Sequence, residues 1–176
     1  MISKMEYRQE IKIPKERVAV LIGKKGEVKK KIEKETGTKI EVDSEEGEVI
    51  IKSEDNVRAY ETRGIVQAIG RGFSPENAEL LLNEKNTLEI INIIDFTGKS
   101  KKKILRMKGR VIGTSGKAKR LIEQFTNTKI SIYGKTISII GEIDAVANAK
   151  RALEGLLKGS THGNVFMWLE RQNSME

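Results

Sequence analysis

The chain has 176 residues, of which 38% are hydrophobic and 33% are charged, enough for one large or two small globular domains with ionic surfaces. Its formal net charge of +8 favours an anionic partner, either nucleic acid or an acidic membrane surface. It contains no cysteine, which excludes disulfides, cysteine-ligated zinc and cysteine nucleophiles and fits a cytoplasmic protein. We find neither a signal peptide nor an apolar run long enough to span a membrane, so no membrane association is expected.

Residues 1–72 predict a first unit with the element order β-α-α-β-β-α. Strands are indicated where apolar and polar residues alternate, and helices where apolar residues recur every three to four positions. On the second helix, Val28, Ile32 and Thr36 mark the face that turns inward. The expected elements are a strand over Tyr7–Ile13, a short helix that ends before Gly23, a helix after Gly26, strands over Thr38–Val42 and Val49–Lys52, and a closing helix over Asn56–Ile69.

Residues 73–86 predict a helical linker. Ser74 is a good N-cap, Pro75 suits the first helical position, and Glu76 lies next to the positive end of the helix. These residues predict a short helix over Pro75–Leu82. Its Leu80–Leu82 patch is expected to pack the two units together.

Residues 87–158 predict a second unit with the same element order, and residues 159–176 predict a tail. The strands of this unit are expected over Leu88–Phe96, Thr128–Ile132 and Thr136–Ile140, and its closing helix over Ile143–Leu157. The tail is expected to form a final helix, docked by Phe166, Trp168 and Leu169.

The two units repeat one another. Val18–Asp43 aligns with Lys108–Tyr133 without a gap, and ten of these 26 positions are identical. An offset of 90 residues is too long for a solenoid repeat and indicates a duplicated domain. The identical pairs are Ile22/Ile112, Gly23/Gly113, Gly26/Gly116, Lys29/Lys119, Ile32/Ile122, Glu33/Glu123, Thr36/Thr126, Thr38/Thr128, Lys39/Lys129 and Ile40/Ile130.

Each copy places a Gly-x-x-Gly turn between two helices. Glycine adopts positive φ and allows close backbone approach at the least steric cost. The helix that follows points its unpaired N–H groups and its positive dipole end at the turn, which creates a place for a phosphate oxygen. The motif alone is weak, but here an Ile precedes it, a helix follows it and Thr-x-Thr-Lys-Ile opens the next strand in both copies.

With this context, both copies resemble type I KH domains. The resemblance implies an α+β fold of two tandem KH domains, each with a three-stranded antiparallel sheet packed on helices, joined by a short helix. It also implies that each loop clamps the backbone of about four single-stranded nucleotides beside an apolar groove. The groove floors expected from it are Ile22, Ile40 and Val42 in the first unit, and Ile112, Ile130 and Ile132 in the second.

Three further stretches resemble the archaeal partner-of-Nob family of KH proteins, which act in small-subunit assembly. They are Ile69–Leu82, Gly109–Glu123 and His162–Gln172, and the resemblance covers nearly the whole chain. It implies work near the 3′ end of small-subunit rRNA, alongside an rRNA-processing endonuclease and with translation or ribosome-assembly factors. Eukaryotic relatives have a degraded first loop, whereas Gly23-Lys24-Lys25-Gly26 is intact here.

The positive charge concentrates in the second unit. Lys99–Ile122 contains ten basic residues and no acidic one, and this run reaches the second loop. A run of a single sign points to nucleic-acid contact more than a solvated helix face does. In contrast, Gly23–Lys34 mixes six lysines with Glu27 and Glu33, at spacings that suit helix support. The second unit is therefore expected to dominate RNA affinity.

Enzymatic activity is not expected. Thr97–Ser100 reads Thr-Gly-Lys-Ser, but the P-loop glycine required before it is replaced by Ile93. His162 is the only histidine and no carboxylate cluster suggests a two-metal nuclease, so we expect no metal and no cofactor. Besides rRNA recognition, a general single-strand binder and a protein scaffold that recruits a nuclease or translation factor remain open.

We expect phosphates to be fixed at the second loop, with bases against the apolar floor. Replacing Gly113 and Gly116 by Asp is expected to abolish RNA binding and leave the fold intact. The predicted RNA-binding residues are Arg106, Lys108, Arg110, Ile112, Gly113, Thr114, Ser115, Gly116, Lys117, Lys119, Ile130 and Ile132 in the second unit, and Gly23, Lys24, Lys25, Gly26 and Lys29 in the first.

Overall fold

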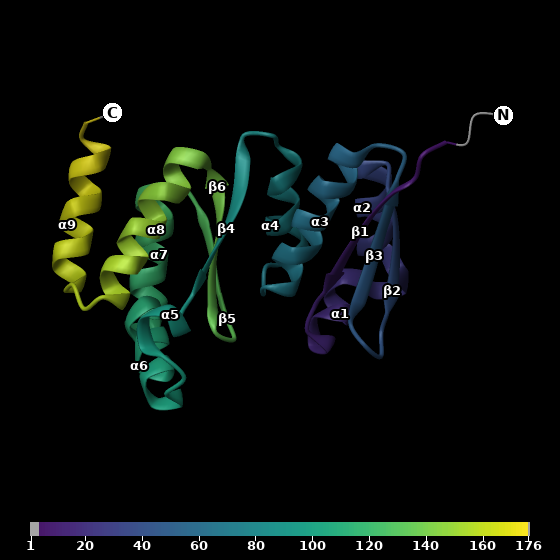
Figure 1. The fold of residues 1–176 in the computed structure, drawn as a ribbon. Coiled ribbons are helices and arrows are strands. Elements are labelled where there is room, and N and C mark those ends of the chain that lie inside the picture. Colours follow the sequence, from purple (N-terminus) through teal and green to yellow (C-terminus); the bar gives the residue numbers. More distant parts are fainter. Residues whose placement is uncertain (1–3, 176) are drawn as a thin grey trace. The chain divides into compact units, whose positions relative to one another are not determined.

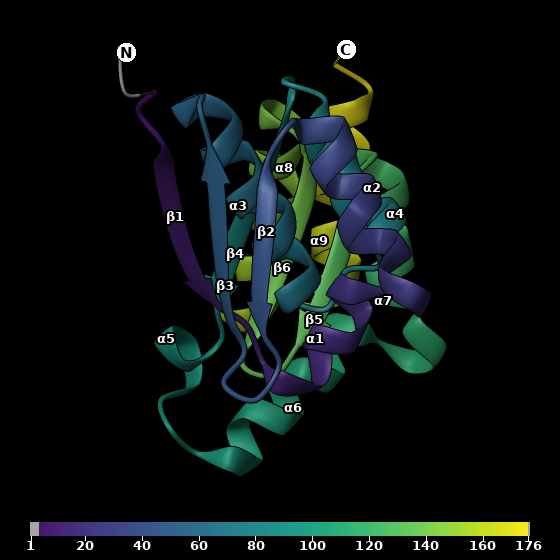
Figure 2. The same cartoon turned by 90° about the vertical axis from the view of Figure 1, so that its right-hand side faces the viewer.

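The structure, a computed structural model, describes residues 4–175 and divides into two compact units between Glu84 and Lys85. The first unit carries an antiparallel sheet in the strand order β1-β3-β2, with the strands side by side in Figure 2. Its elements are β1 (Tyr7–Lys12), α1 (Lys15–Ile22), the 3₁₀ turn η1 (Lys24–Gly26), α2 (Glu27–Thr36), β2 (Lys39–Asp43), β3 (Glu48–Ser53), α3 (Asn56–Gly70), α4 (Pro75–Ala78) and the 3₁₀ turn η2 (Glu79–Leu82).

The second unit repeats this architecture, with an antiparallel sheet in the order β4-β6-β5 (Figure 1). The α+β fold predicted from the sequence, with a three-stranded antiparallel sheet in each unit, is confirmed. The elements of this unit are β4 (Asn86–Asn92), α5 (Ile94–Thr97), α6 (Lys101–Ile112), the 3₁₀ turn η3 (Thr114–Gly116), α7 (Lys117–Thr126), β5 (Lys129–Tyr133), β6 (Thr136–Glu142), α8 (Ile143–Leu157) and α9 (His162–Asn173).

Each core forms between one face of the sheet and its helices. In the second unit, Ile137 and Ile139 of β6 are fully buried against Ile122 of α7 and Leu153 of α8. Their alternation along β6 follows the period of two of a strand, so both side chains point to the same face. The first unit buries Leu21, Ile32, Ile40, Ile51, Ile65 and Ile69 in the same way. No helix within residues 4–175 is long and apolar enough to cross a bilayer.

One predicted strand is too long. The strand expected over Leu88–Phe96 ends at Asn92, and Ile94–Thr97 form the helical turn α5. The backbone turns at Ile93, which has φ −61° and ψ −33° and whose N–H donates to the carbonyl of Lys135 at 2.9 Å. Ile93 is fully buried, so the run of apolar residues continues through the turn. The sequence pattern therefore does not show where the strand ends.

The linker helix forms where it was predicted, although its last turn tightens into η2. The Ser74 hydroxyl accepts a hydrogen bond from the Asn77 N–H at 3.3 Å, and Ala78 is fully buried. Lys31 of α2 pairs with Glu79 at 2.7 Å, and this hydrogen bond raises the pKa of Lys31. These contacts attach the linker to the first unit. Domain boundaries at residues 72, 86 and 158, and packing of the two units through Leu80–Leu82, stay predictions.

Candidate nucleic-acid interface

The two Gly-x-x-Gly loops have the same backbone shape. Gly23 and Gly113 have φ of 73° and 74°, and Gly26 and Gly116 have φ of 77° and 73°. In each loop the first glycine donates its N–H to the carbonyl four residues earlier at 2.9 Å, which ends the preceding helix. The next helix begins directly after the second glycine, so its N-terminal N–H groups and positive dipole end lie behind the loop.

The first glycine of each loop is required by packing as well as by its φ. A Cβ on Gly113 would lie 2.7 Å from the backbone nitrogen of Ala118, and one on Gly23 would lie 2.5 Å from Cγ2 of Val28. The loop therefore presses directly on the helix that follows it. The expectation that Asp at Gly113 and Gly116 spares the fold is wrong at Gly113, because the new side chain collides with α7.

The outer side of the second loop is open. A Cβ on Gly116 would meet no atom within 4 Å, and the side chains of Thr114 and Ser115 are exposed. Ser115 has φ 53° and ψ 29°, a left-handed conformation that non-glycine residues seldom adopt. The loop thus presents backbone and two small polar side chains directly in front of the start of α7.

The predicted basic residues around the second loop divide into two groups. The Arg110 guanidinium donates to the carbonyls of Leu156 and Ser160 and so holds the start of the tail, and Lys119 lies 3.6 Å from Glu123. Arg106 and Lys117 are exposed, and neither makes an ion pair within residues 4–175. Lys108 is half-buried. Arg106 and Lys117 are therefore the cations most available to a phosphate.

Two lysines of α2 in the first unit have acidic partners. Lys29 lies 3.1 Å from Glu33, and Lys31 contacts both Glu35 and Glu79. The helix support expected from the mixed charges of Gly23–Lys34 is present in these pairs. Lys24 and Lys25 within the loop are exposed.

The expected groove floor is only partly at the surface. Ile40 and Ile130 are 1% and 3% exposed, so they belong to the cores and offer no face to a base. Each is the second residue of an edge strand and donates its N–H to a glutamate of the preceding helix, Ile130 to Glu123 at 3.1 Å and Ile40 to Glu33 at 3.0 Å. The residues that keep accessible surface are Ile22, Val42, Ile112 and Ile132.

One exposed apolar residue of α6 was not predicted. Leu105 is 72% exposed and Ile112, seven residues later, is 36% exposed. Seven residues are close to two helical turns, so both point to the same side of α6. Leu105 therefore extends the accessible apolar strip at Ile112 along the helix. The i, i+7 spacing was visible in the sequence, but the exposure was not.

Several identities between the copies serve the fold. In the second unit the hydroxyls of Thr126 and Thr128 lie 2.8 Å apart, and Thr126 donates to the Ile122 carbonyl at 2.6 Å. Thr36 and Thr38 repeat the first distance, at 2.8 Å. These buried hydroxyl pairs fasten the end of a helix to the next strand, which explains the shared Thr-x-Thr without any contact to a ligand.

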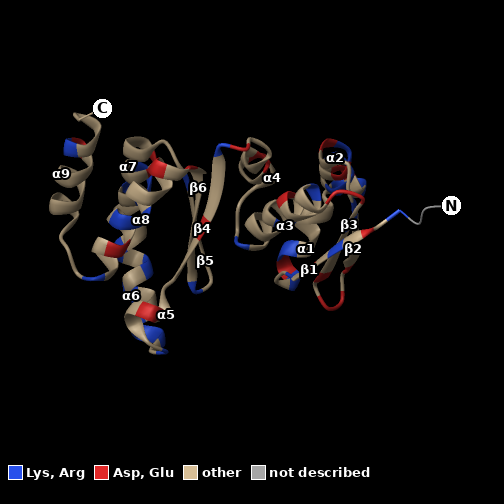
Figure 3. Ribbon diagram, turned by 45° about the horizontal axis from the view of Figure 1, so that its top comes forward, with Lys and Arg blue, Asp and Glu red and all other residues tan. Residues whose placement is uncertain are grey.

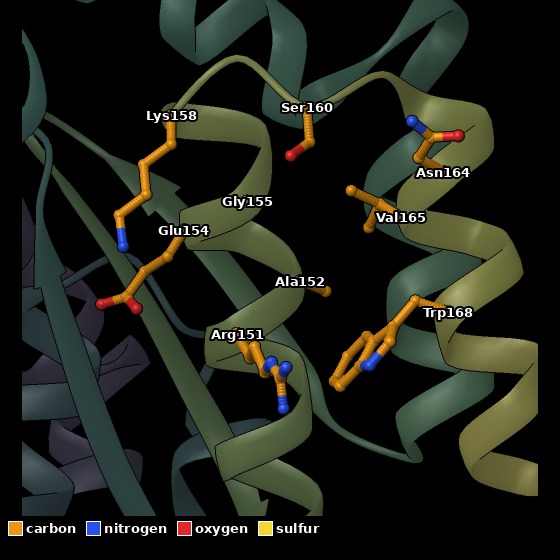
Figure 4. A pocket seen from close by; sticks show the side chains of 9 residues that line it. All are labelled: Arg151, Ala152, Glu154, Gly155, Lys158, Ser160, Asn164, Val165 and Trp168. Atoms are coloured by element: carbon orange, nitrogen blue, oxygen red, sulfur yellow. The ribbon is translucent and has the colours of Figure 1, made fainter.

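A recess of about 310 Å³ between α8 and α9 has an internal contact among its lining residues (Figure 4). The Arg151 guanidinium lies 4.8 Å from the centre of the Trp168 ring, a cation–π arrangement. Val165 and Leu169 on the same helix are buried, whereas Phe166 and Trp168 are partly buried. Of the three predicted anchors of the tail, Leu169 is thus the buried one. Among the described residues, no group of acidic or histidine side chains could hold a metal ion.

Family models match both units. A model described as KH domain matches residues 8–68, and one described as eukaryotic type KH-domain, type I, matches residues 87–174. A KH domain-containing protein of Methanocaldococcus jannaschii is 49% identical over 166 residues, which are 92% of this chain and 72% of that protein. The pre-rRNA-processing protein PNO1 of Candida albicans is 32% identical over 57% of this chain and 37% of its own length. The chain spans less than half the length of the PNO1 relatives it matches.

Solved structures are similar over nearly the whole chain. The structure of Dim2p from Pyrococcus horikoshii has a TM-score of 0.88 and 50% identity, and covers 94% of this chain and 99% of its own. A complex of a/eIF2alpha, aDim2p and rRNA from the same organism contains a chain with a TM-score of 0.92 and 47% identity. That match covers 99% of this chain and 98% of the other.

Proposed function

We propose that this chain, which belongs to the KH-domain family, binds single-stranded RNA beside the loop of its second unit and takes the 3′ region of small-subunit rRNA as its target. The observation that carries the proposal is the preformed loop at Gly113–Gly116, open on its outer side and next to Arg106 and Lys117, which make no ion pair within residues 4–175. The similar Dim2p chain solved with rRNA, and the pre-rRNA-processing relatives, favour this target.

In this mechanism the loop fixes the RNA backbone. Phosphate oxygens approach Thr114 and Ser115, where the N-terminus of α7 supplies N–H donors and positive potential. Lys117 and the basic residues of α6 add attraction without sequence preference. Bases lie against Ile112 and Ile132, and a KH groove holds about four of them. The first unit assists through Lys24 and Lys25.

The proposed role is binding, without a reaction. The protein would hold the rRNA end in register while partners act on it, and we propose the cytoplasm as the place where it does so. The translation factor subunit in the relative's complex favours a translation factor as one protein partner. An rRNA-processing endonuclease, expected from the family resemblance, is the second.

Fluorescence anisotropy with a 3′-terminal small-subunit rRNA oligomer and a scrambled oligomer, at two salt concentrations, tests the proposal. We expect tighter binding to the rRNA end, and log affinity that falls with log salt by about 0.7 per phosphate contact. Equal affinity for both oligomers would leave a general single-strand binder. Salt-resistant binding to a protein partner with no RNA binding would favour a scaffold.

A further inference from the structure

A second recess, of about 530 Å³, lies beside the loop of the second unit on the side where α9 begins. On α6, Arg106 and Ile112 are six residues apart and so point about 120° away from each other around the helix. Arg106 faces this recess, whereas neither Ile112 nor Ile132 lines it. The loop thus has the apolar strip on one side and the recess on the other. The recess is lined by Arg106, Gly109, Gly113, Lys117, His162 and Phe166.

The aromatic wall of the recess is held in place from within the unit. The ring centres of His162 and Phe166 are 6.1 Å apart, with a tilt of 50° between the rings. Nε2 of His162 lies 2.7 Å from the carbonyl oxygen of Arg110, and since a carbonyl only accepts, Nε2 donates. The Arg110 side chain in turn holds the carbonyl of Ser160. Residues of α6 therefore position the start of α9 and its rings.

The floor of the recess is kept free by a glycine. Gly109 is exposed in the interior of α6, where glycine is unfavourable compared with alanine. A Cβ on Gly109 would meet no atom within 4 Å, so packing within the protein does not require glycine there. The aligned position of the first unit is Ala19. Glycine at this position leaves open space directly beside the helix.

We propose that the recess binds one further nucleotide of the RNA strand, beyond those in the groove, with its base on the Phe166 and His162 rings and its phosphate at Arg106 and Lys117. The proposal rests on the proposed RNA-binding function and extends it. An aromatic ring stacks on any base, and free cations attract the phosphate, so the site combines the two features of single-strand binding surfaces. The strand crosses the loop between the groove and the recess.

The test fills the recess by Gly109→Leu in the full chain. The matched control is Gly64→Leu, a helix-interior glycine of α3 whose Cβ would also meet no atom within 4 Å. Each variant is titrated with a four-nucleotide strand from the rRNA 3′ end, which is the length a KH groove holds, and with one of about 12 nucleotides. We expect Gly109→Leu to lose about tenfold in affinity for the longer strand only, which corresponds to one stacked base.

Equal affinity of Gly109→Leu and Gly64→Leu for the longer strand would overturn the recess as a nucleotide site. If the wild-type chain bound neither strand, the proposed function itself would fall, so the two failures are distinguishable. Thermal melting checks that both variants fold. Arg106→Gln provides a second measurement: the salt slope for the longer strand should fall by about 0.7 more than the slope for the four-nucleotide strand. An unchanged slope for the longer strand would also contradict the proposal.

Discussion

The two loops share a backbone and differ in their surroundings. Gly23 and Gly113 have nearly the same φ, and each is pressed against the first turn of the next helix. Around the first loop two of the four lysines of α2 pair with glutamates, Lys29 with Glu33 and Lys31 with Glu79. Around the second loop the exposed cations of α6 and α7 include Arg106 and Lys117, which make no such pairs within residues 4–175.

Charge, more than loop shape, therefore distinguishes the units as RNA-binding surfaces. Figure 3 shows the turn between β2 and β3 in red, where Asp43 to Glu48 are mostly acidic. The α6 helix, from Lys101 to Ile112, has basic residues and no acidic one. A cation already paired with a carboxylate must give up that partner to bind a phosphate, so the second unit is expected to supply most of the affinity.

The largest expected effect comes from acidic side chains in the second loop. Thr114→Asp with Ser115→Asp should weaken RNA binding by at least about 100-fold, because two carboxylates then face the phosphate backbone. Asp tolerates the left-handed conformation of Ser115, so the fold should remain. The matched change, Lys24→Asp with Lys25→Asp, should cost less than about tenfold if the second unit supplies most of the binding free energy. Anisotropy titrations give both values, and a greater loss from the first-loop variant would reverse the ranking of the units.

The next effect concerns stability and should be equal in the two units. Gly113→Ala and Gly23→Ala should each lower the free energy of unfolding by about 2–3 kcal/mol, because a Cβ collides with the next helix and φ is positive. Gly116→Ala meets open space and should cost only about 1 kcal/mol of backbone strain. Urea denaturation measures all three. A Gly113→Ala variant as stable as Gly116→Ala would show that the loop does not press on α7.

A smaller loss is expected at the buried threonines. Thr126→Val should cost about 1–2 kcal/mol, since it leaves the buried Thr128 hydroxyl without this partner, and Thr36→Val should cost less, because the Thr38 hydroxyl keeps Thr62 at 3.4 Å. RNA affinity should be unchanged in both. If Thr126→Val weakened RNA binding without loss of stability, its hydroxyl would have a role at the ligand that the structure does not assign.

The smallest effect is on salt dependence. Lys117→Gln should reduce the slope of log affinity against log salt by about 0.7, which is one phosphate contact to a single strand. Lys29→Gln, whose lysine is paired with Glu33, should leave the slope unchanged. Titrations over a series of salt concentrations provide the slopes. Equal reductions in both variants would mean that internal pairing does not limit contact with RNA.

The duplicated architecture could be predicted because local rules and the repeat agree. Three features recur at a fixed offset of 90 residues: the glycine pair, the helical spacing of apolar residues after it, and the alternation of apolar and polar residues in the strand that follows. The end of β4 could not be predicted, because Ile93, where the backbone turns, is as apolar and as buried as a strand residue. Nothing in a single-sequence pattern separates a buried strand residue from a buried turn residue.

The finer roles within the site depend on tertiary contacts between distant residues. Arg110 was predicted to contact phosphate, but its guanidinium donates hydrogen bonds to carbonyls 46 and 50 residues away in the sequence. Ile130 was predicted to lie in the groove floor, but α7 packs over β5 and buries it. The recess beside the loop is formed where α9 returns to α6, and there His162 bonds to the carbonyl of Arg110.

Hydrogen–deuterium exchange of the full chain, with and without the rRNA 3′-end oligomer, compares both loops in one experiment. The account predicts that RNA slows exchange over Arg106–Lys119 far more than over the first loop and its flanking helices, because the second unit carries the basic run without an acidic residue and the open loop. Protection confined to the first loop, or equal protection of the two, would contradict the assignment of RNA binding to the second unit.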